Sequence, residues 1–130
     1  MQHAFIKLVP KSEKQEISIQ DVKDLFTYYK QITAKTGTQL AWNYTETAFP
    51  YEIIDTSETT IHLKSNHDRY QSIYVGVDVK DDQHFIQITL PDSASYGDKG
   101  KANEFCRFLA KKLQGELHLF NGRIMYFYKR

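Results

Sequence analysis

Cysteine is nearly absent from the sequence, which has only one, Cys106, in 130 residues. A lone cysteine cannot form an internal disulfide, whereas small secreted domains usually carry several cysteines. It also excludes a zinc site built from several thiolates. We therefore expect a protein of a reducing compartment, which points to the cytoplasm.

Long hydrophobic runs and an excess of one charge sign are missing as well. The apolar run within residues 1–10 is interrupted by Lys7 and is too brief for a signal-peptide core or a membrane span. Seventeen Lys and Arg residues against sixteen Asp and Glu residues leave a formal net charge of +1. This balance provides no strong field for nucleic-acid phosphates or anionic lipids, so we expect no membrane binding and disfavour nucleic acid as a partner.

The residues that are present are typical of a globular protein. The chain is 41% hydrophobic, 14% aromatic and 25% charged, which distinguishes it from disordered sequences. A length of 130 residues is near the commonest domain size and too short for two hydrophobic cores. We expect a single domain that spans residues 1–130.

Two stretches with apolar residues at helical spacing predict two helices. The first covers about residues 19–35, because Ser18 and Asp21 resemble an N-terminal capping box and Gly37 interrupts the pattern. The second covers residues 102–113, with Gly115 beyond its end.

Stretches of alternating apolar residues predict strands at residues 4–9, 51–55, 60–64, 72–80 and 85–90. Two more strands flank Asn121-Gly122, which as a two-residue turn would pair His118 with Met125. Residues 38–50 are ambiguous, and we expect a short strand and a loop there.

These elements predict an α+β fold. Each helix has an apolar stripe that needs cover, and the strands share one strongly apolar face. The arrangement that satisfies both is a two-layer sandwich, with two helices on one face of a mostly antiparallel sheet of about six to seven strands. A right-handed crossover could place one strand pair in parallel, and the strand order stays open.

Four short segments of the chain form a recognisable set: residues 4–10 (AFIKLVP), 32–37 (ITAKTG), 101–106 (KANEFC) and 121–124 (NGRI). They resemble a small family of uncharacterised proteins, a domain of unknown function, from spore-forming Gram-positive bacteria. The resemblance runs along the whole chain. It implies a family without established catalytic or binding residues, so no residue role carries over to this sequence.

The first candidate site is the segment at residues 95–101, which we expect to be a loop leading into the second helix. Gly97 and Gly100 permit a concave backbone of amide groups, and Lys99 and Lys101 could complete a small anion site at the helix N-terminus. The spacing matches neither the phosphate-binding loop of nucleotide hydrolases nor the dinucleotide fingerprint. A flexible turn with solvated lysines is the alternative.

The second candidate site is the sheet face opposite the helices. Strand alternation assigns to it His62, Lys64, Tyr74, Phe85, Gln87, His118, Phe120, Arg123, Met125 and Phe127. So many apolar and aromatic side chains on one face indicate a partner surface or a ligand groove. Two alternatives stay open: residues 38–50, with Trp42 and Phe49, could fold across this face, or a register slip of one residue would invert the assignment.

These observations favour a non-enzymatic binding or interaction domain that forms a homodimer or binds a protein partner through the aromatic face. The alternative is a small-molecule binder or enzyme with a pocket near Trp42, His62, Tyr74, His118 and Arg123. Support for catalysis is thin, because the five histidines show no two-ligand helical spacing and Cys106 falls on the apolar stripe of the second helix. We expect neither a metal nor a cofactor.

Overall fold

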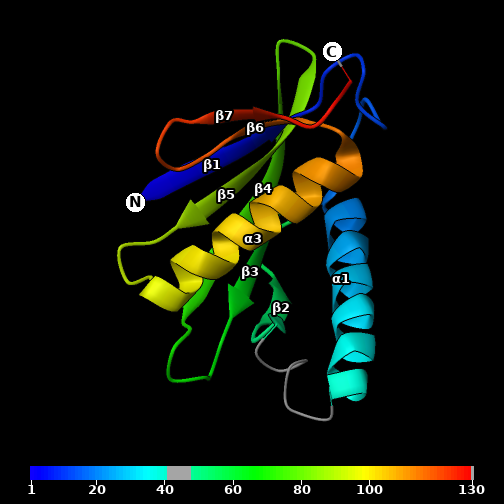
Figure 1. The fold of residues 1–130 in the computed structure, drawn as a ribbon. Helices are drawn as coiled ribbons and strands as arrows, with labels where there is room; N and C mark the ends of the chain where they lie inside the picture. Colours follow the sequence, from blue (N-terminus) through cyan, green and yellow to red (C-terminus); the bar gives the residue numbers. More distant parts are fainter. Residues whose placement is uncertain (41–47, 130) are drawn as a thin grey trace.

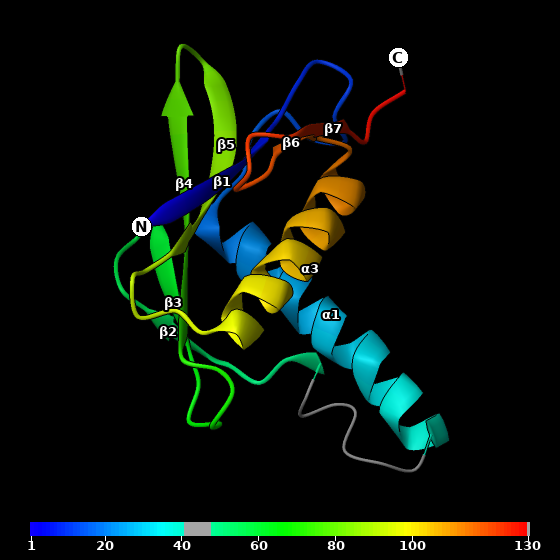
Figure 2. The same ribbon diagram turned by 60° about the vertical axis from the view of Figure 1, so that its left-hand side comes forward.

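The computed structural model describes residues 1–40 and 48–129 and has two layers, a seven-stranded sheet and two helices that lie on one face of it (Figures 1 and 2). The strands are β1 (Gln2–Lys7), β2 (Glu52–Asp55), β3 (Thr60–Lys64), β4 (Ser72–Lys80), β5 (Gln83–Leu90), β6 (Glu116–His118) and β7 (Ile124–Tyr126). The helices are α1 (Ile19–Leu40) and α3 (Tyr96–Leu113). The predicted α+β sandwich is confirmed. Among the described residues, no helix is long and apolar enough to cross a membrane.

The strands lie in the order β2-β3-β4-β5-β1-β6-β7, and every neighbouring pair is antiparallel. The first strand of the chain therefore lies between β5 and β6 and joins two parts of the sheet. A parallel pair, which a crossover would have allowed, does not occur among the described strands. The edge strands β2 and β7 have four and three residues, and short edges limit pairing with other chains.

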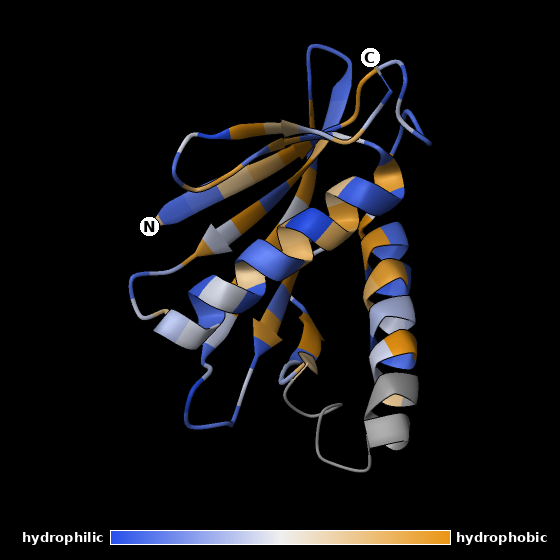
Figure 3. Ribbon diagram, viewed as in Figure 1, coloured by the Kyte–Doolittle hydropathy of each residue, from blue (hydrophilic) through white to orange (hydrophobic). Residues whose placement is uncertain are grey.

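The core lies between the sheet and the helices. Ile6, Ile86 and Leu117 come from neighbouring strands and are fully buried. Phe26 of α1 meets Phe105 of α3 edge to face, with ring centroids 5.3 Å apart. Figure 3 shows hydrophobic residues interspersed with hydrophilic ones along the strands and helices, so each element has one side suited to this core.

Helix α1 is longer than the sequence predicts, since it continues through Gly37 to Leu40. One glycine inside a helix costs only about 1 kcal/mol relative to alanine, which does not suffice to end it here. The strand expected within residues 38–50 is therefore wrong for residues 38–40, which are helical. Residues 41–47, with Trp42, lie outside the described residues.

The aromatic ring of Phe49 lies on the helix side of the sheet. It is buried, with its centroid 5.5 Å from that of Phe26 and 5.3 Å from that of Phe105. Phe49 thus belongs to the core and does not cover the opposite sheet face, contrary to the alternative that placed it there.

Helix α3 begins at Tyr96 rather than at Ala102. Its N-cap is Ser95, whose hydroxyl accepts a hydrogen bond from the Asp98 amide at 3.1 Å, while the Asp98 carboxylate accepts one from the Ser95 amide at 3.0 Å. The loop expected at residues 95–101 is therefore wrong, because this capping box outweighs the low helix propensity of two glycines. The first turns of α3 contain Gly97, Lys99, Gly100 and Lys101.

The Asp98 carboxylate is fully buried and joins three parts of the chain. Besides the Ser95 amide, it accepts hydrogen bonds from the amides of Gln71 and Ser72 at 3.0–3.1 Å. The hydroxyl of Tyr51 donates to it at 2.5 Å. Burial raises the pKa of Tyr51 and the hydrogen bond to Asp98 raises it further, so the phenol stays a donor. The carboxylate thus holds the start of α3 against the β3–β4 connection and the segment before β2.

The hairpin of β6 and β7 has a three-residue loop, residues 120–122, instead of the predicted two-residue turn. Its last residue, Gly122, has a φ of 86°, which favours glycine. His118 consequently pairs with Ile124, so the predicted pairing with Met125 is wrong by one residue. A slip of one residue exchanges the two faces of a strand.

Asp98→Asn is expected to lower the free energy of unfolding by about 2–4 kcal/mol. The amide keeps the shape but removes the charge and leaves a buried donor without an acceptor, at about 1–3 kcal/mol for each such loss. Denaturant unfolding measures the change. The matched control is Asp68→Asn, at an exposed aspartate of the β3–β4 connection, which should differ from wild type by less than about 0.5 kcal/mol. Equal effects of the two substitutions would contradict the role of Asp98.

Gly97→Ala and Gly100→Ala are expected to have opposite effects although both glycines lie in α3. A Cβ at Gly97 would lie 2.5 Å from the Arg69 carbonyl oxygen, so we expect a loss of roughly 1–3 kcal/mol. A Cβ at Gly100 meets nothing within 4 Å, so alanine should stabilise the protein by about 0.5–1 kcal/mol. Thermal unfolding of both variants measures these changes in stability. A Gly97 variant as stable as wild type would rule out the close approach between residue 97 and the Arg69 carbonyl oxygen.

Candidate functional site

The sheet face opposite the helices has no described element lying across it, and we name it the open face (Figure 2). Its side chains are the residues that alternate with the buried core residues of each strand. From β2 to β7 they include Ile54, His62, Tyr74, Phe85, Gln87, His3, Phe5, Lys7, Glu116, His118, Ile124 and Tyr126.

Strand register brings apolar residues together on one half of the open face. Phe5 of β1 lies opposite His118 of β6, which lies opposite Ile124 of β7. Phe85 and Tyr126 lie in the next row of the sheet. The rings of Phe5 and Phe85 meet edge to face at 6.0 Å, while Ile124 and Tyr126 are 41% and 43% exposed. We name Phe5, Phe85, Ile124 and Tyr126 the apolar half.

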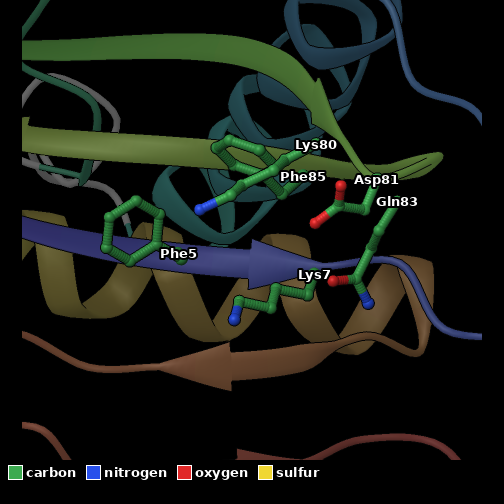
Figure 4. Close-up of a pocket in the computed structure, with 6 residues that line it drawn as sticks. All are labelled: Phe5, Lys7, Lys80, Asp81, Gln83 and Phe85. Carbon is green, nitrogen blue, oxygen red and sulfur yellow. The ribbon is translucent and has the colours of Figure 1, made fainter.

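An open hollow of about 670 Å³ lies beside the β4–β5 hairpin on this half (Figure 4). The rings of Phe5 and Phe85 supply the apolar part of its lining. The remaining lining residues carry charges of both signs or an amide: Lys7, Lys80, Asp81 and Gln83. Such a hollow suits an apolar side chain with a polar end.

The other half of the open face carries a stacked pair, His62 and Tyr74. Their ring centroids are 4.4 Å apart with an angle of 10° between the planes, and His62 Nε2 lies 2.8 Å from Ser72 Oγ. Burial lowers the pKa of His62, and the nearby Lys64 ammonium lowers it further. The imidazole is therefore neutral at pH 7 and stacks on Tyr74 as an uncharged ring.

His118 is remote from this pair. Its Nε2 lies 2.7 Å from Glu116 Oε1, on the same strand. Strands β3 and β6 are four steps apart in the sheet, which at about 4.8 Å per step separates His62 from His118 by about 19 Å. These side chains therefore do not converge on one small-molecule pocket, and Trp42 lies outside the described residues.

Four of the predicted binding residues lie on the open face: His62, Tyr74, Phe85 and His118. The placement of the other four is wrong. Phe120, Met125 and Phe127 pack against the core, and Arg123 lines a pocket beside α3. The cause is the three-residue hairpin loop, which takes up Phe120 and shifts β7 by one residue, so that the faces of β7 are exchanged.

Three residues of the apolar half escaped prediction as binding residues, namely Phe5, Ile124 and Tyr126. The alternation at residues 4–9 contains the signal for Phe5, because Ala4 and Ile6 point inward on either side of it. No comparable signal exists for the other two, since their face depends on the length of the hairpin loop.

The anion site predicted at the start of α3 lacks its concave loop. The Asp98 carboxylate occupies the position where an anion would meet the helix N-terminus, and Ser95 caps the Asp98 amide. Lys101 pairs with Glu104 at 3.0 Å. Gly97 and Gly100 are helical, and Lys99 lines a different pocket together with Arg107 and Arg123.

The groups with chemical reactivity are few. Cys106 is fully buried, and burial raises the pKa of its thiol to about 12, which keeps it protonated. Within residues 1–40 and 48–129, no three His, Cys, Asp or Glu side chains gather in a way that could hold a metal ion.

The known proteins that match this chain have descriptions that state no function. The chain is similar to a solved structure described as a protein of unknown function from Bacillus stearothermophilus, with 43% sequence identity and a TM-score of 0.64. The similarity covers 88% of this chain and 92% of that chain. A comparison with curated proteins finds no match. The family model described as domain of unknown function (DUF1885) matches residues 2–129. The chain therefore belongs to the DUF1885 family, which confirms the predicted resemblance to uncharacterised Gram-positive proteins.

Proposed function

We propose that the protein is a binding domain that forms a two-fold homodimer through the apolar half of the open face. One observation carries this proposal: the hollow beside Phe5 and Phe85 and the exposed side chains of Ile124 and Tyr126 lie on the same uncovered face. In a monomer all four side chains keep apolar area in water. Its burial contributes about 25 cal/mol per Å² to association.

In a dimer, the hollow of one copy could receive Ile124 and Tyr126 of the other, because the hollow and these side chains lie close together on the open face. Strand β7 is two steps from β1, or about 10 Å at the usual spacing. A two-fold axis between them would place Ile124 and Tyr126 of each copy in the hollow of the other, so that every contact is made twice. Sheets that stack face to face lie about 10 Å apart, a gap that interdigitated side chains of this size fill.

The charges on this half do not oppose such a contact. The formal net charge of +1 makes the repulsion between two copies small, and salt screens it. Lys7 and Lys80 of the hollow lie near Asp81, and Glu116 lies opposite Lys7 in the sheet. Lys7 and Glu116 lie in the row between Phe85 and Tyr126, so both signs are present near the proposed axis, where Lys7 of one copy would meet Glu116 of the other.

A non-enzymatic role in the cytoplasm is part of the proposal. The three histidines of the open face already have side-chain partners: Thr89 and Gln87 for His3, Ser72 for His62 and Glu116 for His118. The lone, buried Cys106 is compatible with a reducing compartment. A different protein partner on the same face is the competing occupant, and the dilution experiment below separates the two.

Ile124→Glu is expected to weaken dimerisation at least about 30-fold, because two carboxylates would be buried without partners at a cost of about 2 kcal/mol or more. Sedimentation velocity across a dilution series gives the dissociation constant. The matched control is Ile54→Glu, because Ile54 is 37% exposed on the open face but lies at the opposite edge of the sheet. It should leave the dimer intact. A wild-type mass that stays monomeric at every concentration would remove the dimer and favour a heterologous partner.

A mixture of Ile124→Glu and Phe85→Glu chains is expected to dimerise although each variant alone does not. In the mixed dimer, one of the two symmetric contacts joins an intact Ile124 to an intact hollow, while the other contact carries both changes. Roughly half of the association free energy should return, as measured by capture of an untagged variant on a tagged one. A mixture that stays monomeric would exclude this geometry.

A further inference from the structure

A second pocket, of about 410 Å³, lies on the helix side of the sheet, between α3, the start of β1 and the β6–β7 hairpin. Its lining gathers three cationic side chains, Lys99, Arg107 and Arg123. Three amide side chains, of Gln2, Asn103 and Asn121, complete its polar part, and the lining contains no carboxylate. The pocket is therefore positively charged and rich in hydrogen-bond donors.

The local structure explains why these cations meet. Lys99, Asn103 and Arg107 follow one another at intervals of four residues, which places them on one side of α3. Arg123 comes from the hairpin, where its carbonyl accepts a hydrogen bond from the Leu119 amide at 2.8 Å. Its amide donates to Asn121 Oδ1 at 3.0 Å. The register that removes Arg123 from the open face thus brings it to α3.

The three cations have no carboxylate partner among residues 1–40 and 48–129. The ion pairs found there involve other groups, such as Lys101 with Glu104 on the same helix. Like charges gathered in one pocket repel each other, and a bound anion relieves this repulsion. Because Lys99, Arg107 and Arg123 are exposed, salt screens the attraction and the site should be strongest at low ionic strength.

An adjoining hollow of about 710 Å³ shares Gln2 and Lys99 with the cationic pocket. Most of its lining is apolar, with Met1 and Leu90 beside Tyr96, whose side chain is almost fully exposed. Its one carboxylate, Asp92, is already paired with the N-terminal amine at 2.7 Å. The two pockets together form a groove that is cationic at one end and apolar at the other.

We propose that this groove binds a small organic di- or triphosphate. The phosphates lie among Lys99, Arg107 and Arg123, because guanidinium groups match phosphate oxygens with two hydrogen bonds each. The apolar or aromatic part of the ligand lies against Tyr96. Pockets of a few hundred Å³ are the usual size of small-molecule sites. A formal net charge of +1 is also far below that of a typical nucleic-acid-binding domain, which is strongly basic. The open face lies on the other side of the sheet, so this proposal does not rest on the dimer.

Titration calorimetry of the full chain with inorganic pyrophosphate at low ionic strength tests the cationic end. Arg107→Gln and Arg123→Gln are each expected to weaken binding about tenfold or more, since each removes charged hydrogen bonds to phosphate. Lys64→Gln removes the same charge from an exposed position on the open face, on the other side of the sheet, and it should change the affinity less than about twofold. Absence of pyrophosphate binding, or an equal loss in the Lys64 variant, would overturn the site.

Adenosine diphosphate tests the apolar end, because it joins the same two phosphates to an aromatic base. Tyr96→Ala is expected to weaken its binding about fivefold or more and to leave pyrophosphate binding unchanged. An unaffected affinity for adenosine diphosphate would overturn the role of Tyr96 and reduce the groove to a phosphate site. A single-stranded oligonucleotide that binds where pyrophosphate does not would overturn the small-ligand proposal in favour of nucleic acid.

Discussion

The buried carboxylate of Asp98 is the constraint on which the arrangement of the two layers depends. Its donors belong to separate parts of the chain: the Ser95 amide, the amides of Gln71 and Ser72, and the Tyr51 hydroxyl. A carboxylate buried without such donors would cost several kcal/mol, so α3 can start only where all of them meet. Helix α3 contacts β1, β4, β5 and β6. Fixing its start therefore also determines which face of the sheet is left open.

The overall fold could be predicted because its main signals are periodic and independent of distant contacts. Ile73 and Val75 alternate with polar neighbours and are buried in β4, as the pattern indicates. The prediction failed where a local interaction competes with propensity. Gly97 and Gly100 indicate a loop, yet the capping box of Ser95 and Asp98 starts a helix across them. In physical terms, hydrogen bonds at a helix end outweigh residue propensities that are each worth about 1 kcal/mol or less.

The open face could be predicted only in part, because the register of its last hairpin depends on loop length. The dipeptide Asn121-Gly122 favours a two-residue turn, in which both residues have positive φ. In the structure only Gly122 does, whereas Asp81 and Asp82 of the β4–β5 hairpin adopt this conformation with φ values of 52° and 63°. Sequence composition does not determine which hairpin takes which turn, since the choice also depends on packing of the flanking strands. Here Phe120 joins the loop and packs against the core.

That one additional loop residue divides the side chains of the hairpin between two surfaces. With a two-residue turn, Arg123 and Met125 would lie on the open face and Ile124 and Tyr126 would face the helices. The open face would then carry Arg123 and Met125 in place of Ile124 and Tyr126, and the pocket beside α3 would lose one of its three cations. The observed register places Ile124 and Tyr126 on the open face and Arg123 beside α3. The sheet separates the two surfaces, so a phosphate ligand and a second copy would not compete for the same area. Any coupling between them would pass through β1, whose Gln2 lines the groove and whose Phe5 lines the hollow.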